Sequence, residues 1–470
     1  MKHIHFIGIC GVGMSALAIL WKKKGYKVTG SDAGFYPPVS THLEQNQIDF
    51  YAGWHPEKMG TPDLVVVGNV ASSENPEWQF VQTNNIPHVS YPQLIAQNLV
   101  KQNSIVCAGT YGKTSTTSLL AYILIHANYN PAYMFGGLCQ SLPYAADDLT
   151  ESLHAEASAK AWSVLEGDEY KTGKENPEAK FFSYKPTHLL LTGLEWDHFD
   201  MYPAEELYYD AFIKLLAMIP ENGLIVACGD NENLKRVTQN VGDKKIVTYG
   251  TKNNVDYKYS DIITDKNGIQ FTITHQGNEY KIYSPMLGRY MTENICGAFA
   301  MAREIGIDAN IIIEAIKSFQ GIKRRLEKRG QTVNGAPVFD DIAHSPVKAK
   351  SVLATLREIY TGKIIAVFEP NTGNRQITAA PSYDHAFADA DEVIIPRLTK
   401  IKIGENPDEV MDDAKLFEVV VKTNPQTRKI DEDEKLTEYL KTAADHEDAI
   451  VFLGSHGFRG MIEAIISPHQ

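Results

Sequence analysis

The chain has 470 residues, which is too long for one hydrophobic core and close to the length of three ordinary domains. Its formal net charge of −13 argues against a nucleic-acid partner, because phosphate backbones attract basic surfaces. The five cysteines are scattered and odd in number, which argues against a disulfide framework or a zinc site and favours a reducing compartment. With no signal-peptide pattern and no apolar run of about 20 residues, the sequence predicts a cytoplasmic protein without a membrane partner, and nothing in it indicates a protein partner.

A glycine turn opens the chain, inside a strand–helix–strand pattern over residues 3–32. The turn carries Gly8, Gly11 and Gly13 in the order G-x-x-G-x-G, and Asp32 follows the second strand. Backbone N–H groups at such a turn and the positive end of the next helix bind anionic diphosphates. We expect a diphosphate here, with Asp32 facing a ribose or a base. Because the glycine order is not that of the dinucleotide fingerprint, a nicotinamide-dependent dehydrogenase is the weaker alternative.

The most informative stretch is residues 104–117, where an apolar strand enters a glycine-bracketed turn and continues as a helix. The turn reads G-T-x-G-K-T, in which Lys113 supplies a point charge and the Thr114 hydroxyl is a ligand for Mg²⁺. A glycine-rich turn with a solvated lysine is the simpler alternative, and a non-catalytic nucleotide-binding protein is another. The pattern predicts an ATP site formed by Gly109, Thr110, Gly112, Lys113, Thr114 and Ser115.

Acidic residues follow two later apolar strands, expected at residues 162–165 and 187–191. Glu166 comes directly after the first strand, and His198 follows the second, among Glu195, Asp197 and Asp200. Carboxyl ends of parallel strands meet at one edge of a sheet, and Mg²⁺ prefers hard oxygen ligands. We therefore predict a metal site held by Thr114, Glu166 and His198, although acids that open a helix and a structural histidine would give the same pattern.

A basic cluster at residues 323–325 opens the last third of the chain. A guanidinium presents a bidentate fork to phosphate oxygens, so Arg325 is expected to clamp a phosphate. Surface solvation is the alternative for most of these cations. Asp341 and His344 follow at the end of the next expected strand.

Strands alternate with helices along the whole chain, which predicts an α/β protein with mainly parallel sheets. We expect three domains: a Rossmann-like N-terminal domain at residues 1–100, a central P-loop ATPase-like domain with a parallel sheet at 101–320, and a Rossmann-like α/β C-terminal domain at 321–470. The polar stretches 151–160 and 171–180 are expected to be solvated loops or helix faces. Further strands are expected at residues 64–67, 337–339, 363–368, 392–395 and 449–453.

Taken together, these motifs occur in the order that is typical of the Mur ligase family, which the chain resembles from about residue 3 to residue 460. The ordered set is specific, although no single motif is. It consists of Gly8-x-x-Gly11-x-Gly13 with Gly30-Ser31-Asp32, the G-T-x-G-K-T turn, Glu166 with Asp168-Glu169, Asp197-His198, Arg324-Arg325-Leu326-Glu327 and Asp341-x-Ala343-His344-x-Pro346.

The resemblance implies an enzyme, an ATP-dependent carboxylate–amine ligase that uses ATP and Mg²⁺ to form a C–N bond through an acyl phosphate. It implies UDP-N-acetylmuramate as the carboxylate substrate. The stretches at residues 8–11, 30–41, 67–69 and 168–170 favour a murein tripeptide, L-alanyl-γ-D-glutamyl-meso-diaminopimelate, as the amine substrate in peptidoglycan recycling. Free L-alanine is the alternative amine substrate.

The resemblance also assigns roles to individual residues. It places the UDP-sugar at Gly8, Gly11, Gly13 and Asp32 of the N-terminal domain. It implies catalytic roles for Lys113, Glu166, His198, Arg325 and His344, and it adds Asn294, Arg325 and Asp341 to the ATP-binding set. The chain departs from the family at Tyr290 and Met291 in the adenine segment, at Lys171 and Asn371 in peptide-side motifs, and at Ile213, where some relatives carry a carbamylated lysine.

Overall fold

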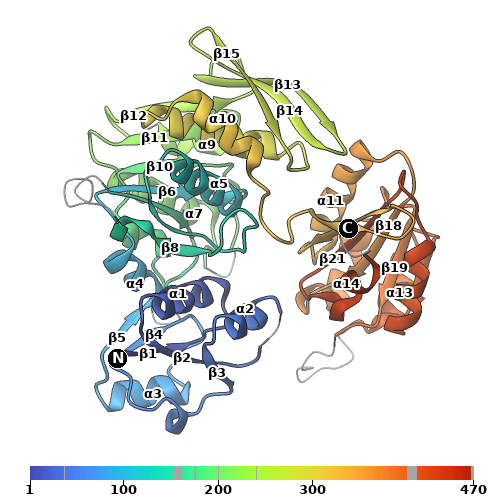
Figure 1. Ribbon diagram of the computed structural model, residues 1–470, viewed down its shortest axis with the longest axis horizontal. Helices are drawn as coiled ribbons and strands as arrows, with labels where there is room; N and C mark the ends of the chain where they lie inside the picture. The colour runs from blue at the N-terminus through green and yellow to red at the C-terminus, as the bar shows by residue number, and fades with distance from the viewer. Residues whose placement is uncertain are drawn as a thin grey trace. The chain divides into compact units, whose positions relative to one another are not determined.

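The computed structural model of this chain describes residues 1–35, 37–152, 161–173, 176–198, 201–239, 241–399 and 410–466. Three sheets rich in parallel strands form the fold, so the predicted α/β class is confirmed. One sheet falls within each of the three expected domain ranges (Figure 1). The expected boundaries themselves stay a prediction.

The first sheet has five strands in the order β3-β2-β1-β4-β5, and its pairings are parallel. Chain order reverses at β1, because β2 lies on one side of it and β4 on the other, so the glycine turn after β1 lies at a topological switch point. In Figure 1, α1 and α2 lie on one face of this sheet and α3 on the other. The elements are β1 His3–Ile7, α1 Val12–Lys23, β2 Lys27–Asp32, α2 Val39–Gln45, β3 Asp49–Ala52, β4 Leu64–Val67, α3 Pro76–Thr83, β5 His88–Ser90 and α4 Tyr91–Asn98.

The second sheet has ten strands in the order β15-β14-β13-β12-β11-β10-β6-β9-β7-β8. Its centre is parallel, and β6 lies between β10 and β9, so the turn after β6 is also at a switch point. Antiparallel pairs β7–β8 and β14–β15 form its two margins. The strands are β6 Asn103–Ala108, β7 Ala132–Met134, β8 Ala146–Asp148, β9 Trp162–Gly167, β10 His188–Leu191, β11 Leu224–Cys228, β12 Lys245–Gly250, β13 Tyr257–Asp265, β14 Gly268–His275 and β15 Asn278–Ser284. The helices are α5 Lys113–His126, α7 Glu205–Met218, α8 Glu232–Thr238, α9 Met291–Glu304 and α10 Ala309–Ser318, with a short 3₁₀ helix, η3, at Lys180–Tyr184.

The third sheet has six strands in the order β16-β17-β21-β18-β19-β20. Only β16 is antiparallel among its described pairings. The elements are β16 Glu327–Gln331, β17 Pro337–Asp341, α11 Pro346–Ile359, β18 Ile364–Glu369, β19 Glu392–Pro396, α12 Asp413–Val420, β20 Thr427–Ile430, α13 Asp433–Thr442, β21 Ala449–Gly454 and α14 Met461–Ile465. The strands expected from the sequence are thus all present.

These sheets belong to two compact units. Unit 1 comprises Met1–Ile263, Ile269–Met286 and Tyr290–Ile322, and unit 2 comprises Thr264–Gly268, Leu287–Arg289 and Lys323–Gln470. Unit 1 therefore contains both the first and the second sheet. One hydrophobic cluster includes Leu17 from α1 and Val106 from β6, and Lys23 of α1 forms an ion pair with Asp147 of β8 (Nζ to Oδ2, 2.7 Å). The two glycine turns are consequently carried by one packed body.

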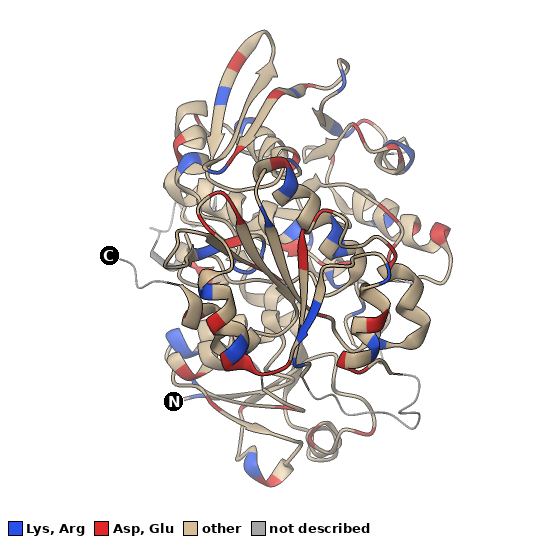
Figure 2. Cartoon of the chain, turned by 90° about the vertical axis from the view of Figure 1, so that its right-hand side faces the viewer, with Lys and Arg blue, Asp and Glu red and all other residues tan. Residues whose placement is uncertain are grey.

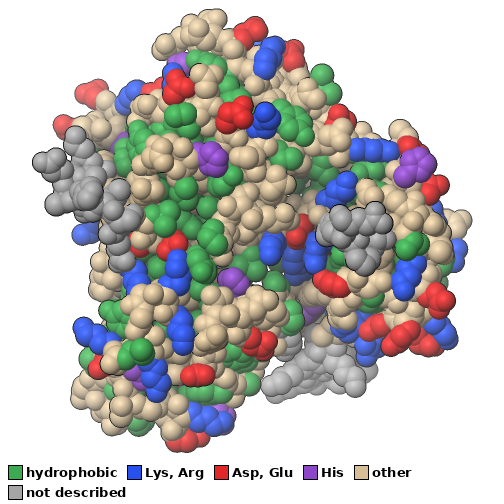
Figure 3. Space-filling view, viewed as in Figure 1, with side chains coloured by type: hydrophobic (Ala, Val, Ile, Leu, Met, Phe, Trp, Pro, Cys, Tyr) green, Lys and Arg blue, Asp and Glu red, His purple; other side chains and the backbone are tan. Residues whose placement is uncertain are grey.

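Basic and acidic positions are interspersed along the elements in Figure 2, and charged side chains of both signs are interspersed over the face drawn in Figure 3. This pattern follows from a composition in which 45 basic residues accompany 58 acidic ones. Within the described ranges, no helix is long and apolar enough to cross a membrane.

Candidate active site

The turn between β6 and α5 has the geometry of a phosphate-binding loop. Gly109 and Gly112 have φ angles of +132° and +75°, which residues with a Cβ atom rarely adopt. A Cβ atom on Gly109 would lie 2.2 Å from Thr192 Oγ1, and one on Gly112 would lie 2.2 Å from the side-chain oxygen of Asn294. Glycine is therefore required at both positions, and the buried amide of Asn294, at the start of α9, lies against the loop.

Lys113 lies at the centre of this loop with its ammonium fully engaged. Its Nζ donates to Gly109 O at 2.6 Å, to Thr110 O at 3.3 Å and to Glu169 Oε1 at 2.9 Å. Burial alone would lower the pKa of Lys113, but the neighbouring Glu169 carboxylate outweighs it and raises that pKa. The lysine is thus held as a cation where a phosphate would bind.

Glu169 connects the loop to His198. Its side chain is 0 % exposed, and the same Oε1 that accepts from Lys113 lies 3.3 Å from His198 Nε2. The hydrogen bond with Glu169 raises the pKa of His198, which favours the imidazolium. The other oxygen, Oε2, is buried and finds no hydrogen-bond partner in the described part of the chain. Sequence reasoning gave Glu169 no role, although it follows Glu166 in the same acidic run.

Glu166, at the end of β9, is joined to the first turn of α5. Its Oε1 accepts from the Thr114 hydroxyl at 2.9 Å, and its Oε2 accepts from the backbone N–H of Gly136 at 2.6 Å. Burial is the main cause of the raised pKa of Glu166. Octahedral Mg²⁺, with bonds of about 2.0–2.1 Å, holds neighbouring ligand oxygens about 2.9 Å apart. The two side chains therefore fit Mg²⁺ as adjacent ligands.

Glu166 is paired with the Thr114 hydroxyl, whereas no such pairing of an acid with a hydroxyl is described beside His198. Across the described residues, no group of three or more His, Cys, Asp or Glu side chains is arranged to hold a metal ion. Thr114 and Glu166 would therefore leave most positions around an Mg²⁺ ion to phosphate oxygens and water, which is how Mg²⁺ is usually bound. Asp200, part of the predicted acidic cluster, lies outside the described residues.

The first glycine turn is built differently from the phosphate loop. Gly8 has φ +90°, and its N–H and that of Ile9 donate to Ser31 O at 2.8 and 3.0 Å. Asp32 accepts from the backbone N–H of Cys10 at 2.8 Å and from that of Ala33 at 2.7 Å. Burial raises the pKa of Asp32. Its carboxylate thus braces the turn from the end of β2, and the N–H groups of Gly8, Ile9 and Cys10 all have acceptors within the protein.

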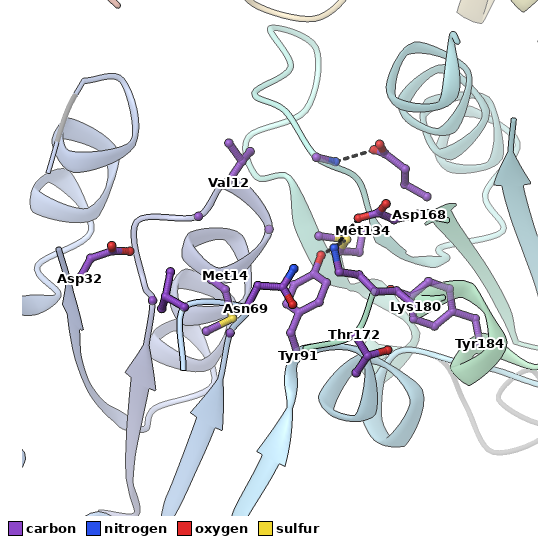
Figure 4. Close-up of a pocket in the computed structure, with 17 residues that line it drawn as sticks. Val12, Met14, Asp32, Asn69, Tyr91, Met134, Asp168, Thr172, Lys180 and Tyr184 are labelled. Atoms are coloured by element: carbon purple, nitrogen blue, oxygen red, sulfur yellow. Dashed lines mark hydrogen bonds and ion pairs between the residues drawn. The ribbon is translucent and has the colours of Figure 1, made fainter. Parts of the chain in front are cut away.

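A cavity of about 300 Å³ connects this first turn to Glu166 within unit 1 (Figure 4). Figure 4 shows Asp32 and Val12 at one end and Asp168, Lys180 and Tyr184 at the other. The lining consists of Gly8, Gly11, Val12, Gly13, Met14, Asp32, Gly68, Asn69, Val70, Tyr91, Met134, Gly136, Glu166, Asp168, Thr172, Lys180 and Tyr184.

The sequence interpretation was wrong for Lys180, because it placed residues 171–180 in solvated loops or helix faces. Its side chain is only 12 % exposed and forms an ion pair with Asp168 at 2.5 Å. Burial would raise the pKa of Asp168, but Lys180 outweighs burial and lowers that pKa. Of the other polar stretch, residues 153–160 lie outside the described residues.

The predicted residues near the start of unit 2 divide into a buried and an exposed group. Arg324 is buried, with its guanidinium on Asp340 Oδ1 at 3.2 Å and on the carbonyls of Gly454, Ser455 and His456, whereas Arg325 is exposed. Arg324 adopts φ +58° and Leu326 φ +46°, and both are buried on either side of the exposed Arg325. Arg325 is therefore the arginine that is available to a ligand.

Asp341 and His344 follow β17 in the same unit. Asp341 accepts from the backbone N–H of Leu326 at 2.6 Å and of Ala343 at 2.8 Å, and burial raises its pKa. His344 Nδ1 lies 2.7 Å from Ile342 O, and burial lowers its pKa, which favours the neutral ring. The predicted site residues thus fall into two sets. Asp341, His344 and Arg325 belong to unit 2. The others gather around one loop of unit 1, namely Lys113, Thr114, Glu166, His198 and Asn294.

Comparison with known proteins identifies the family to which this chain belongs. Three family models match in order: the catalytic domain of the Mur ligase family at residues 3–102, the Mur ligase middle domain at 107–302, and the Mur ligase glutamate ligase domain at 324–456. The chain is 30% identical over 460 residues to the UDP-N-acetylmuramate–L-alanine ligase of Methylorubrum extorquens, covering 96% of this chain and 94% of that protein.

Two solved structures are similar over nearly the whole chain. A murein peptide ligase of Psychrobacter arcticus is 27% identical with a TM-score of 0.72, covering 100% of both chains. The UDP-N-acetylmuramate–alanine ligase of Thermotoga maritima has a TM-score of 0.79 at 22% identity, covering 99% of this chain and 98% of that one, and shows the shared fold.

The chain belongs to the Mur ligase family. It is accordingly an ATP-dependent ligase that forms an amide bond, and it acts in cell-wall biosynthesis. The dehydrogenase and the non-catalytic nucleotide-binding protein are therefore no longer needed as explanations of the two glycine turns.

Proposed function

We propose that the enzyme joins the lactyl carboxylate of UDP-N-acetylmuramate to the amine of L-alanyl-γ-D-glutamyl-meso-diaminopimelate, with ATP as the activating substrate and Mg²⁺ as the metal. The observation that carries the proposal is the cavity between the first glycine turn and Glu166. A diphosphate at the N-terminus of α1, directly after the first glycine turn, would direct its sugar along this cavity. The sugar carboxylate then arrives at the acid that is hydrogen-bonded to the phosphate-loop residue Thr114.

The proposed chemistry has two steps. A carboxylate oxygen attacks the γ-phosphorus, the bond from phosphorus to the ADP oxygen breaks, and an acyl phosphate forms. The peptide amine then attacks the acyl carbon, inorganic phosphate leaves, and the nitrogen loses a proton. Such phosphoryl transfer depends on positioning and charge neutralisation more than on covalent help from the protein.

The chain's residues supply those two requirements. Lys113 provides a fixed positive charge at the phosphates, and the N–H groups of Gly109, Gly112 and Ser115 complete the ATP cradle, in which Thr110 is held by its own N–H bond to Gly193 O at 2.8 Å. Thr114 and Glu166 would hold Mg²⁺, and the ion would neutralise charge on the phosphate oxygens. His198 would be a further metal contact in its neutral form, so metal binding there would release its proton. For Asn294, Arg325 and Asp341 we propose nucleotide contacts, and for His344 a catalytic role.

The tripeptide is proposed over free L-alanine because the murein peptide ligase structure matches the full length of the chain and exceeds 25% identity. L-Alanine is the second candidate amine. It is favoured by the curated relatives, which carry the name of the alanine ligase at up to 30% identity.

A phosphate-release assay with ATP, Mg²⁺ and UDP-N-acetylmuramate tests the proposal, with the tripeptide in one reaction and L-alanine in another. We expect turnover to require all four components and to be at least tenfold faster with the tripeptide. Faster turnover with L-alanine would replace the peptide ligase by the alanine ligase. A reaction that does not depend on UDP-N-acetylmuramate would reject both.

A further inference from the structure

We propose that Lys180 recognises the carboxylate of the sugar nucleotide and thereby selects an acidic sugar over a neutral one. This inference rests on the proposed function, because it assigns the residue that holds the reacting group of that substrate. None of the sequence motifs includes Lys180, and its place in the cavity follows from the fold of the loop after β9.

Backbone hydrogen bonds bring Lys180 back beside the end of β9. The N–H of Thr172 donates to Glu178 O at 2.9 Å, that of Lys180 to Tyr170 O at 3.1 Å, and that of Phe181 to Asp168 O at 3.2 Å. The loop thus closes on itself, and η3 begins at the level of the strand end. These backbone hydrogen bonds fix where the main chain of Lys180 lies.

The surroundings of the Lys180 ammonium favour an anionic ligand. Lys180 is the only cation among the described residues that line the cavity, whereas Asp32, Glu166 and Asp168 are acids. A carboxylate that approaches Glu166 and Asp168 would meet like charges, and Lys180 is the cation of the cavity lining that offsets them. An ammonium has three donors, so its bond to Asp168 leaves capacity for a second carboxylate.

The aromatic neighbours of Lys180 restrict where its charge can be. Its Nζ lies 5.6 Å from the centroid of the Tyr170 ring and 6.0 Å from that of Tyr91. Figure 4 shows the side chain pointing toward Asp168 and Tyr91, at the end of the cavity opposite Asp32. The diphosphate is expected at the first glycine turn, at the Asp32 end. The Lys180 end therefore faces the part of the ligand that reacts.

Binding of two ligands that differ only at the lactyl group tests this assignment. UDP-N-acetylmuramate carries the lactyl carboxylate, and UDP-N-acetylglucosamine lacks it. Isothermal titration calorimetry of the full chain without ATP should show that Lys180→Met weakens UDP-N-acetylmuramate binding about 10- to 100-fold, as expected for one charged hydrogen bond. Binding of UDP-N-acetylglucosamine should change less than about twofold. Lys180→Gln provides a second uncharged variant if the methionine variant fails to fold.

Two further variants separate recognition from structure. Lys180→Arg keeps the charge and should retain most of the preference for the acidic sugar. Lys101→Met removes a similarly buried ion pair of unit 1, from Lys101 Nζ to Asp148 Oδ2 at 2.9 Å, outside the cavity, and should leave the preference unchanged.

The outcomes distinguish this inference from the proposed function. The role of Lys180 would be overturned if both uncharged variants bound the two ligands equally weakly or kept the wild-type preference for UDP-N-acetylmuramate. The proposed function would still stand if the wild-type enzyme turned over its substrates. A wild-type enzyme that neither binds UDP-N-acetylmuramate nor turns it over would overturn the proposed function itself.

Discussion

The two glycine turns of unit 1 share their topology but differ in their charges. Each follows a strand at a switch point of its sheet and leads into a helix, α1 or α5. Around the first turn, backbone carbonyls and the Asp32 carboxylate accept the loop's N–H groups. Around the second, Lys113 and Glu169 form a buried ion pair. The same backbone arrangement therefore carries two different distributions of charge.

This difference in charge fits the roles that we propose for the two turns, which are anchoring a sugar nucleotide and transferring a phosphate. The diphosphate that we propose at the first turn keeps its charge throughout the reaction, so the N-terminal dipole of α1 would suffice to bind it. Phosphate groups that are transferred redistribute charge, and a preorganised cation stabilises that redistribution in a site from which water is excluded. The comparison predicts that side-chain charge matters at the second turn and steric fit at the first.

The largest expected effect is at Lys113. Lys113→Ala should lower kcat/KM about 10²- to 10³-fold, because it removes the preorganised charge at the phosphates. It also leaves Glu169 buried without its cation, so the free energy of unfolding should fall by about 1–3 kcal/mol. Steady-state phosphate release and denaturant unfolding measure the two effects.

A double variant separates stability from catalysis at this loop. Lys113→Ala with Glu169→Gln removes both charges and should recover stability without recovering turnover. Lys101→Ala serves as the control lysine outside the site. Turnover of Lys113→Ala within about tenfold of wild type would remove the distinction between the two turns.

At the first turn we expect a steric effect from Gly13→Ala. A Cβ atom there would lie 2.3 Å from Tyr91 Oη and 2.9 Å from Met134 Cε, so the turn or the ring must move. Alanine is otherwise the better helix former by about 1 kcal/mol, and the clash reverses that preference. We expect calorimetry to show binding of UDP-N-acetylmuramate weakened more than about tenfold.

Gly25→Ala is the matched control for this effect. Gly25 follows α1 with φ +84°, and the space that a Cβ atom would occupy there is open, so alanine should cost only about 1 kcal/mol of stability. It should leave ligand affinity unchanged. Equal affinities of the Gly13 and Gly25 variants for UDP-N-acetylmuramate would show that the contact of Gly13 with Tyr91 and Met134 does not control binding.

A smaller effect is expected where α9 supports the phosphate loop. Asn294→Ala removes the amide that lies against Gly112 and should lower turnover about tenfold. Because Asn294 supports the loop and is also proposed to contact the nucleotide, the loss should be larger with ATP than with GTP. An equal loss with both nucleotides would limit Asn294 to supporting the loop.

The smallest effect concerns pH and the charge network of the second turn. The pKa of His198 is raised by Glu169, so its stabilising contribution is complete below its ordinary pKa near 6.5 and is lost as pH rises through the raised value. In protein free of metal and nucleotide, the difference in Tm between wild type and His198→Gln should shrink as pH increases from 6 to 9.

His188 provides the opposite sign within the same unit. Burial lowers its pKa to about 4, so its neutral form contributes stability that is lost as pH falls from 6.5 towards that value. His188→Phe should therefore flatten the acid side of the Tm profile, whereas His198→Gln flattens the neutral-to-alkaline side. Identical profiles for the two variants would reject both assignments.

Local sequence patterns were sufficient for the strands and for both turns. Apolar runs such as residues 104–108 and 449–453 are buried strands, and glycines at fixed offsets permit left-handed backbone. The same short-range signals located Glu166 beside Thr114, because both follow strands that pair in one sheet.

Long-range packing explains what the sequence did not reveal. Lys180 lies in a polar stretch that is typical of a solvent-exposed loop, and only the closure of that loop brings it to Asp168. Glu169 resembles any other acid of its run, and its burial depends on the partners that Lys113 and His198 provide. Interactions of this kind depend on pairing across many residues, for which a single sequence carries no periodic signal.

The engaged ammonium of Lys113 has a consequence for product release. Its three hydrogens already have acceptors in Gly109 O, Thr110 O and Glu169 Oε1, so an incoming phosphate gains the cation by exchange. When ADP departs, the same three oxygens receive the ammonium again, and no bare charge is left in the loop. Release of product limits many enzymes, and we expect this exchange to shorten the residence time of ADP.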